Sequence, residues 1–255
     1  MKIRVIGCSG AEFPGHNPPS FLLDEEIVFD AGSITNVLDR KAQLKIKYIF
    51  ITHAHLDHIL SIPFLADNII VGNGGRTLTL YSIAPVIRTI RNHLFNSSVW
   101  PDFTLIPNPK EAVISLTALK AGRKISVNGF SVTPYPVNHP VPAVGYLVEN
   151  KAGKSFFYTG DTGPTPKTWK QVGRRKIQAL IIDVSFPNSM QDLAVTTGHL
   201  TPGLLWEEIR HIPCKPQRIY ITHLKPQYSA KISAELRRLP FDHLKVLKDG
   251  DTVRV

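Results

Sequence analysis

The chain has 255 residues, of which 43% are hydrophobic and 20% charged, as expected of a globular protein large enough to bury a core without cross-links. Its two cysteines, Cys8 and Cys214, exclude a disulfide framework and are expected to be free thiols. The formal net charge of +10 favours phosphates, nucleic acid or anionic membranes as partners, although a general bias toward basic residues explains it equally well.

The apolar runs predict one domain over residues 1–255 in which strands and helices alternate. In the first half, strands are expected at 3–6, 21–23, 27–29 and 48–51, and a helix at 83–95. Consecutive strands are expected at 112–116, 124–127, 130–136, 144–149 and 155–159. The last third predicts strands at 179–183, 218–222, 245–247 and 252–254, with helices at 202–211 and 229–239. This order indicates two sheets with helices outside them, a layered α/β arrangement.

The N-terminal segment, residues 1–7, predicts a strand, because it has too few apolar residues for a signal peptide. No run approaches the roughly 18 apolar residues of a membrane span. We therefore expect a cytoplasmic protein with no membrane partner.

Three histidines and one aspartate follow the strand at 48–51 directly: His53, His55, Asp57 and His58. Alternate residues of an extended segment point the same way, so His53 and His55 can face one point. If a helix begins near Asp57, then Asp57 and His58 project toward a second point nearby. Imidazole and carboxylate are preferred ligands of zinc and similar ions. Because four such residues in one loop cannot easily surround one ion, the pattern predicts two neighbouring ions, and chance histidines in a polar loop explain it poorly.

The spacing His-x-His-x-Asp-His at 53–58 resembles the motif of the metallo-β-lactamase superfamily. The resemblance implies an α+β fold, a four-layered αββα sandwich, with three ligands downstream. These are matched by His139, Asp161 and His223, each of which follows an expected strand. The family pattern gives one metal to His53, His55 and His139, the other to Asp57, His58 and His223, and a bridging position to Asp161. Two divalent ions are expected, with zinc first and manganese or iron compatible with the same ligands.

Further stretches resemble class II cyclic-nucleotide phosphodiesterases: 53–59, 93–96, 99–103, 159–164, 184–188, 198–202 and 221–226. Of these, 184–188 together with 198–202 is the most specific, whereas residues 60–63 depart from the small and Gly-containing residues expected there. The resemblance implies hydrolysis of cyclic AMP or cyclic GMP to 5′-monophosphates by a hydroxide that bridges the metals.

His199 is the best candidate for a general acid or a phosphate ligand, because it precedes an expected helix whose N-terminus favours anions. The alternative is that this segment is only a helix cap, with Thr201 as the N-cap residue. Asp57 and Asp161 are expected to take part in catalysis as well as to bind metal.

Five side chains are candidates for substrate binding: His93, Asn96, Trp100, Asn188 and Thr201. The indole of Trp100 could stack on a purine, and Asn96 could hydrogen-bond a base edge or the sugar. Packing in the core or in a lid explains Trp100 equally well. Asn188 follows Pro187, so turn geometry is an equal alternative to substrate contact.

The main alternative function is a nuclease resembling the tRNA 3′-end processing endonuclease, with nucleic acid as its substrate. It shares the ligand set and a His-x-Thr motif like that at 199–201, and the basic charge favours it. The lack of a long insertion rich in glycine and lysine argues against it. A metal-dependent scaffold is less well supported, because all seven ligand-type residues are present. A homodimer is common in related folds, but the sequence leaves the oligomeric state open.

Overall fold

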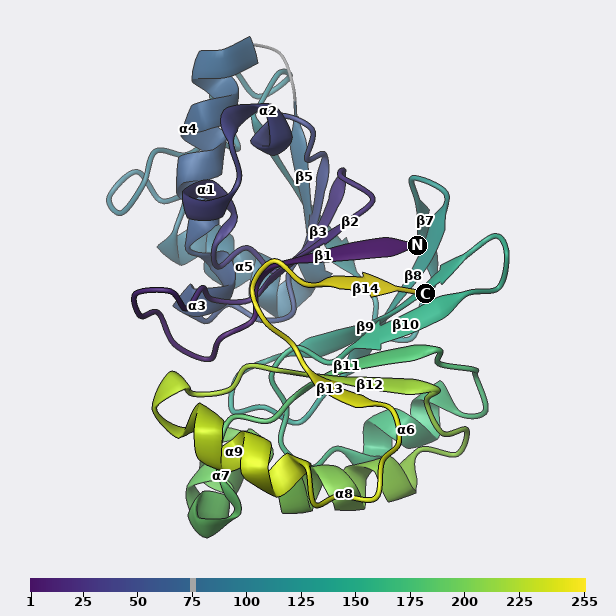
Figure 1. The fold of residues 1–255 in the computed structure, drawn as a ribbon. Helices are drawn as coiled ribbons and strands as arrows, with labels where there is room; N and C mark the ends of the chain where they lie inside the picture. Colours follow the sequence, from purple (N-terminus) through teal and green to yellow (C-terminus); the bar gives the residue numbers. More distant parts are fainter. Residues whose placement is uncertain (74–76) are drawn as a thin grey trace.

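The computed structural model describes residues 1–73 and 77–255. Two sheets of seven strands lie face to face, and helices cover the outer face of each (Figure 1). The predicted four-layered αββα sandwich is therefore confirmed. None of the helices in the described ranges is both long and apolar enough to cross a membrane.

The first sheet has the strand order β14-β1-β2-β3-β4-β5-β6. Its strands are β1 (Lys2–Gly7), β2 (Ser20–Leu23), β3 (Ile27–Phe29), β4 (Tyr48–Phe50), β5 (Leu78–Ile83), β6 (Ile114–Leu119) and β14 (Thr252–Arg254). The pairs from β14 to β3 are antiparallel, and those from β3 to β6 are parallel.

The second sheet has the order β13-β12-β11-β10-β9-β8-β7. Its strands are β7 (Ile125–Val127), β8 (Phe130–Pro136), β9 (Val144–Asn150), β10 (Ser155–Tyr158), β11 (Ala179–Asp183), β12 (Arg218–Thr222) and β13 (Leu244–Val246). Strands β7 to β10 pair antiparallel and β10 to β13 pair parallel. As a result β8, β10, β11 and β12 all run in one direction, and the residues that follow them emerge at one edge of the sheet.

The helices divide between the two outer faces (Figure 1). Those over the first sheet are α1 (Ile34–Val37), α2 (Arg40–Gln43), α3 (Leu56–Ile59), α4 (Ser61–Asn73) and α5 (Ala84–His93). Those over the second are α6 (Pro166–Val172), α7 (Gln191–Thr197), α8 (Pro202–His211) and α9 (Ser229–Leu236), with short 3-10 turns at Asn188–Met190 and Pro226–Tyr228.

Three apolar clusters fill the spaces between the four layers. Ile49 and Leu65 belong to the cluster under the first set of helices, whereas Phe50 and Phe156 belong to the cluster between the sheets. Strand β11 shows why both faces of a sheet must be apolar: Ile181 packs between the sheets, and its neighbour Leu180 packs under the second set of helices.

Most elements lie where the sequence predicted them, and β8, β11, β12, β14 and α8 have the predicted bounds. Strand β5 and helices α1, α2, α4, α6 and α7 were not predicted from the sequence. Helix α4 is apolar on most sides, so its sequence does not alternate between apolar and polar residues with the period of a helix. It also carries Pro63 in its first turn. Cys8 and Cys214 are free thiols, as predicted.

Candidate metal centre

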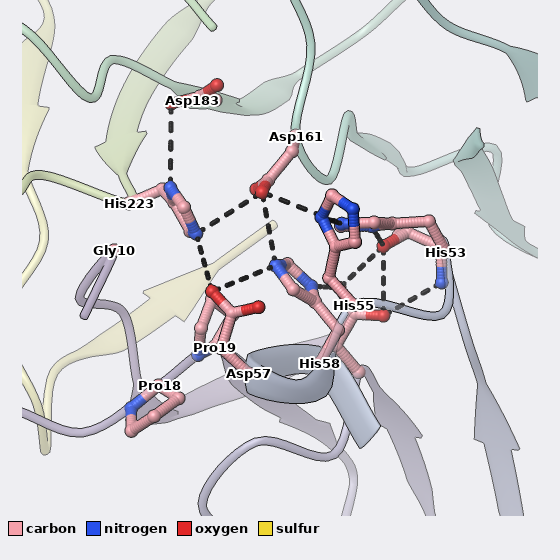
Figure 2. Close-up of polar contacts among 12 residues, drawn as sticks. Gly10, Pro18, Pro19, His53, His55, Asp57, His58, Asp161, Asp183 and His223 are labelled. Atoms are coloured by element: carbon pink, nitrogen blue, oxygen red, sulfur yellow. Dashed lines mark hydrogen bonds and ion pairs between the residues drawn. The ribbon is translucent and has the colours of Figure 1, made fainter. Parts of the chain in front are cut away.

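The seven predicted ligands converge at one edge of the sandwich. Figure 2 labels six of them, all except His139. Four come from the segment after β4, and the other three follow β8, β10 and β12. Both sheets therefore contribute ligands.

The donors form two groups. His53, His55 and His139 are called the first donor group, and Asp57, His58 and His223 the second donor group. Asp161 lies within reach of both groups.

The first donor group brings three imidazole nitrogens together. His53 Nε2 lies 3.0 Å from His55 Nδ1, and His139 Nε2 lies 3.2 Å from the same atom. His53 Nε2 is also 3.7 Å from Asp161 Oδ2. Burial lowers the pKa of His53 well below its ordinary value, and the neighbouring His58 adds to the effect. A neutral imidazole has a free lone pair, which is the form that binds a metal.

The second donor group surrounds the same carboxylate from the other side. His58 Nε2 and His223 Nε2 each lie 3.3 Å from Asp161 Oδ2. His223 Nε2 is 3.4 Å from Asp57 Oδ2, and His58 Nε2 is 3.8 Å from it. Burial opposes the charged form of Asp161, but His223 and His58 outweigh it and hold its pKa well below the usual range. Asp161 is therefore an ionised carboxylate between the two groups.

Two buried atoms in this cluster have no hydrogen-bond partner among the described residues: His58 Nε2 and Asp161 Oδ1. An unpaired buried polar atom costs about 1–3 kcal/mol. Both atoms belong to side chains that point into the cluster (Figure 2). Nitrogen and carboxylate donors with this arrangement fit divalent metal ions of the zinc type.

Asp30 is a residue of this centre that the sequence reading missed. Its buried carboxylate accepts hydrogen bonds from His58 Nδ1 at 2.8 Å, Tyr158 Oη at 2.7 Å and the Thr52 backbone N–H at 2.8 Å. By holding Nδ1–H of His58, Asp30 turns the opposite nitrogen toward the cluster. The available signal was an aspartate placed directly after the fully buried strand β3.

Asp183 and Ser185 form a second supporting network that the sequence reading missed. Asp183 is the last residue of the buried strand β11, and its Oδ2 lies 2.8 Å from His199 Nδ1. Ser185 Oγ donates to Asp183 Oδ1 at 2.5 Å and lies 2.9 Å from His223 Nδ1. A chain of hydrogen bonds therefore links His223 of the second donor group to the same carboxylate that holds His199.

His199, the predicted general acid or phosphate ligand, lies against the cluster, and its catalytic role stays a prediction. Its ring stacks on that of His223, with centroids 5.3 Å apart and planes 15° apart. Burial disfavours the protonated form, but the Asp183 carboxylate and its hydrogen bond outweigh this and raise the pKa of His199 above its ordinary value. With Nδ1 on Asp183, the Nε2 atom of a protonated His199 is free to donate to a bound molecule.

Gly198 shows how closely the backbone approaches the first donor group. Its φ of +71° lies in the left-handed region, and a Cβ there would lie 2.4 Å from Pro140 Cδ and 2.8 Å from His139 Nδ1. The Gly198 carbonyl accepts a hydrogen bond from His139 Nδ1 at 3.0 Å. This contact leaves His139 Nε2 directed at the cluster, so glycine is needed both for the turn and for the space.

The predicted substrate residues around α5 have local roles in the structure. Asn96 Oδ1 accepts from the backbone N–H groups of Ser98 and Val99 at 3.0 and 2.8 Å, which is a turn-stabilising pattern. Trp100 packs edge-on against Phe64, with centroids 5.1 Å apart. His93 is exposed at the end of α5. Among the interactions of the described residues, none joins these side chains to the donor groups, so their contact with substrate stays a prediction.

Asn188 and Thr201 both cap helix α8. Asn188 Oδ1 accepts from Gly203 N at 2.7 Å, and Thr201 Oγ1 accepts from Leu204 N at 3.3 Å. Thr201 is fully buried. The structure therefore gives both residues a capping role, and substrate contact by either one stays a prediction.

A family model described as a β-lactamase superfamily domain matches residues 27–224, which include all seven candidate ligands. The chain belongs to the β-lactamase superfamily. The predicted class, a hydrolase with the metallo-β-lactamase fold, is thereby confirmed.

Several relatives of this β-lactamase superfamily hydrolase have names that state an activity. A probable 3′,5′-cyclic-nucleotide phosphodiesterase of Yersinia pestis is 27% identical over 220 residues, which cover 77% of this chain and 61% of that protein. A 3′,5′-cyclic-nucleotide phosphodiesterase of Aliivibrio fischeri is 27% identical over 285 residues, covering 91% and 82%. A ribonuclease Z of Archaeoglobus fulgidus is 24% identical over 291 residues, covering 91% and 90%.

Among solved structures, unliganded yeast PDE1 superposes with a TM-score of 0.86 at 18% identity, covering 98% of each chain. At this identity the similarity establishes the fold alone.

Proposed function

We propose that this protein is a 3′,5′-cyclic-nucleotide phosphodiesterase that opens the cyclic phosphate of cyclic AMP or cyclic GMP to a 5′-monophosphate. The observation that carries the proposal is a His–Asp pair, His199 with Asp183, set against a compact cluster of seven metal-type donors. Phosphodiester cleavage needs both parts, since a phosphate must be polarised and a departing alkoxide must receive a proton. The two relatives named as cyclic-nucleotide phosphodiesterases support this choice of substrate.

In this proposal the first donor group would hold one divalent ion and the second donor group another, with Asp161 within reach of both groups. Zinc is the expected metal, because neutral imidazoles and carboxylates dominate the set. When bound, the two ions supply Lewis-acid polarisation of the phosphoryl group and lower the pKa of a water molecule. Asp57 and Asp161 contribute the negative charge that balances the ions.

His199 then supplies the proton. Ring opening to a 5′-monophosphate forms a bond between phosphorus and the oxygen of a water molecule that has lost a proton to solvent. It breaks the bond between phosphorus and the 3′-oxygen, which leaves as an alkoxide. Asp183 accepts the hydrogen bond from His199 Nδ1, so Nε2 of the protonated ring donates to that oxygen. Against the opposing effect of burial, the Asp183 carboxylate raises the pKa of His199 above its ordinary value, which favours the protonated ring that a general acid needs. Helix α8 begins three residues further on, at Pro202, and its dipole is favourable for a phosphate bound beside His199.

The direct test is turnover. Metal-loaded protein is incubated with cyclic AMP and, separately, with cyclic GMP, and the products are separated by chromatography. We expect at least one of them to yield the 5′-monophosphate, with loss of activity after chelation. Failure of the metal-loaded protein to turn over either nucleotide overturns the proposal.

A second candidate is a nuclease that processes tRNA 3′ ends. It is favoured by the Archaeoglobus fulgidus ribonuclease Z, whose match covers 90% of that protein, and by the net charge of +10. Incubation with a precursor tRNA distinguishes the two functions. Specific 3′ cleavage, with RNA binding that weakens steeply as salt rises, would favour the nuclease.

A further inference from the structure

A small cavity of about 130 Å³ lies beside the candidate metal centre. Helix α5 contributes Pro85, Val86 and Thr89 to its lining, and the segment after His139 contributes Val141 and Pro142. The cavity is thus formed between a helix over the first sheet and the β8–β9 connection of the second sheet. No predicted substrate residue lines it.

The cavity and the donor cluster share one residue, His55. Its Nδ1 atom faces His53 Nε2 at 3.0 Å and His139 Nε2 at 3.2 Å. The same imidazole also forms part of the cavity wall, next to Ala54. If a phosphate group binds at the cluster, only the imidazole ring of His55 separates it from this cavity.

The residues that line the cavity favour an uncharged ring of a ligand. It consists of two prolines, two valines and an alanine, besides Thr89 and His55, and none of the described residues lining it is a lysine, arginine, aspartate or glutamate. Sites that enclose a whole drug-sized ligand measure roughly 300–1,000 Å³. A cavity of about 130 Å³ is therefore suited to one flat apolar group and not to an entire nucleotide.

We propose that this cavity binds the nucleobase of the substrate and makes Thr89 a specificity-determining residue, an inference that rests on the proposed cyclic-nucleotide function. The base packs between the side chains of α5 and the Val141–Pro142 segment. Thr89 Oγ1 donates to the Pro85 carbonyl at 3.2 Å, which leaves its lone pairs free to accept a hydrogen bond from an exocyclic amino group of the base.

The helical repeat of α5 extends this surface. Residues four apart lie on the same face of a helix, so Pro85, Thr89 and His93 form one row. His93, at the end of α5, is one turn beyond the cavity wall. Pro85 and Thr89 line the cavity, so a base edge that projects beyond Thr89 would next approach His93.

The test fills the cavity from its exposed side. Thr89→Trp places an indole in it without disturbing the buried core, because Thr89 is exposed. Arg88→Trp is the matched control, since Arg88 is an exposed neighbour on α5 that does not line the cavity. Each variant is assayed with cyclic AMP and with a ribose 3′,5′-cyclic phosphate that carries a methoxy group in place of the base.

For Thr89→Trp we expect KM for cyclic AMP to rise about tenfold, the usual scale of a lost base-stacking contact, with little change for the baseless substrate. Arg88→Trp should leave the ratio of the two KM values unchanged. An equal change in both variants, or an equal effect on both substrates, overturns the inference.

A binding measurement separates this inference from the proposed function. Methyl NMR signals of Val86 and Val141 are followed while 5′-AMP is added to the metal-free protein. Shifts that Thr89→Trp removes and Arg88→Trp retains support the base site, even if neither cyclic nucleotide is hydrolysed and the proposed function fails. Absence of shifts in the unmodified protein counts against the base site, even if cyclic AMP is turned over.

Discussion

The two donor groups of the candidate metal centre are held in place by different kinds of partner. In the first donor group, His139 Nδ1 donates to the Gly198 carbonyl and His53 Nδ1 lies 3.0 Å from the Thr52 hydroxyl. Both partners are neutral. In the second donor group, His58 Nδ1 bonds to the buried carboxylate of Asp30.

The remaining histidine of the second donor group, His223, also depends on a buried carboxylate. Its Nδ1 reaches Asp183 through Ser185 Oγ. A carboxylate behind an imidazole raises the basicity of the ligand and fixes its orientation more strongly than a neutral acceptor does.

The Thr52 hydroxyl beside His53 itself donates to Asp30 Oδ2 at 2.9 Å, so His53, like His223, reaches a buried carboxylate through a hydroxyl. His58, with a carboxylate directly behind it, therefore has the strongest electrostatic support, whereas His139 depends on backbone geometry. The following variants test this difference.

The largest effect is expected for Asp161→Ala, because Asp161 is the one residue that both groups share. The rate of hydrolysis of the cyclic nucleotide should fall about 10³-fold or more, since polarisation of the phosphoryl group by the metal ions stabilises the transition state by several kcal/mol. Elemental analysis should show metal loss from both positions. Asp192→Ala, at an exposed aspartate of α7, is the control. A full complement of metal in Asp161→Ala contradicts the shared role.

His199→Ala should separate chemistry from metal binding. Removing a general acid typically costs about 10²- to 10⁴-fold in rate. Metal content should stay at the level of the unmodified protein, because Asp183 and Ser185 still support His223. His211→Ala, at an exposed histidine of α8, should leave both properties unchanged. If His199→Ala loses metal, the residue is a ligand and the acid assignment is wrong.

Asp30→Asn tests the electrostatic support of the second donor group. It keeps the shape of the side chain but removes the charge opposite His58, so metal affinity should fall about 10- to 100-fold. Competition with a chelator measures this, and the ion held by the second donor group should be weakened most, because His58 contacts Asp30 directly whereas His53 reaches it through the Thr52 hydroxyl. Asp39→Asn, at the N-cap of α2, serves as the control. Unchanged affinity would show that His58 needs no carboxylate behind it.

Gly198→Ala tests the geometric support of the first donor group. A residue with Cβ at a φ of +71° costs about 1–3 kcal/mol, and here the Cβ also meets Pro140 and His139. Gly153→Ala is the matched control, because Gly153 has a φ of +70° with nothing within 4 Å of the added Cβ. Denaturant unfolding should show the greater loss of stability for Gly198→Ala, and only that variant should lose metal from the first donor group. If the two variants lose the same amount of stability, the contacts of the added Cβ with Pro140 and His139 do not matter.

The ligand positions could be predicted from local spacing and from a family resemblance. The spacing at 53–58 indicates a metal site by itself, whereas His139, Asp161 and His223 are identified by the resemblance to the metallo-β-lactamase superfamily. Strand direction explains why these three residues lie near the 53–58 segment, because residues that follow strands running in one direction emerge at one edge. The layered fold followed from the same alternation of strands and helices.

The supporting residues could not be predicted in this way. Asp30 has no characteristic spacing, and its partner Tyr158 lies 128 positions away in the sequence. The substrate-binding role of Asn96, Asn188 and Thr201 stays a prediction. In the structure, all three side chains accept hydrogen bonds from backbone N–H groups. A side chain with a nearby backbone partner needs no ligand to explain its position.

The candidate ligands lie on segments that follow strands of both sheets, and this has a consequence for folding. His53, His55, Asp57 and His58 follow β4 of the first sheet, whereas His139, Asp161 and His223 follow strands of the second. With the proposed ligands, bound ions cross-link the two halves of the sandwich, and their binding free energy adds to the free energy of unfolding. At a free metal concentration of about 1,000 times Kd, this contribution is about 4 kcal/mol. The melting temperature should then depend on metal availability, so the same ions would set both the reactivity of this protein and its persistence as a folded chain.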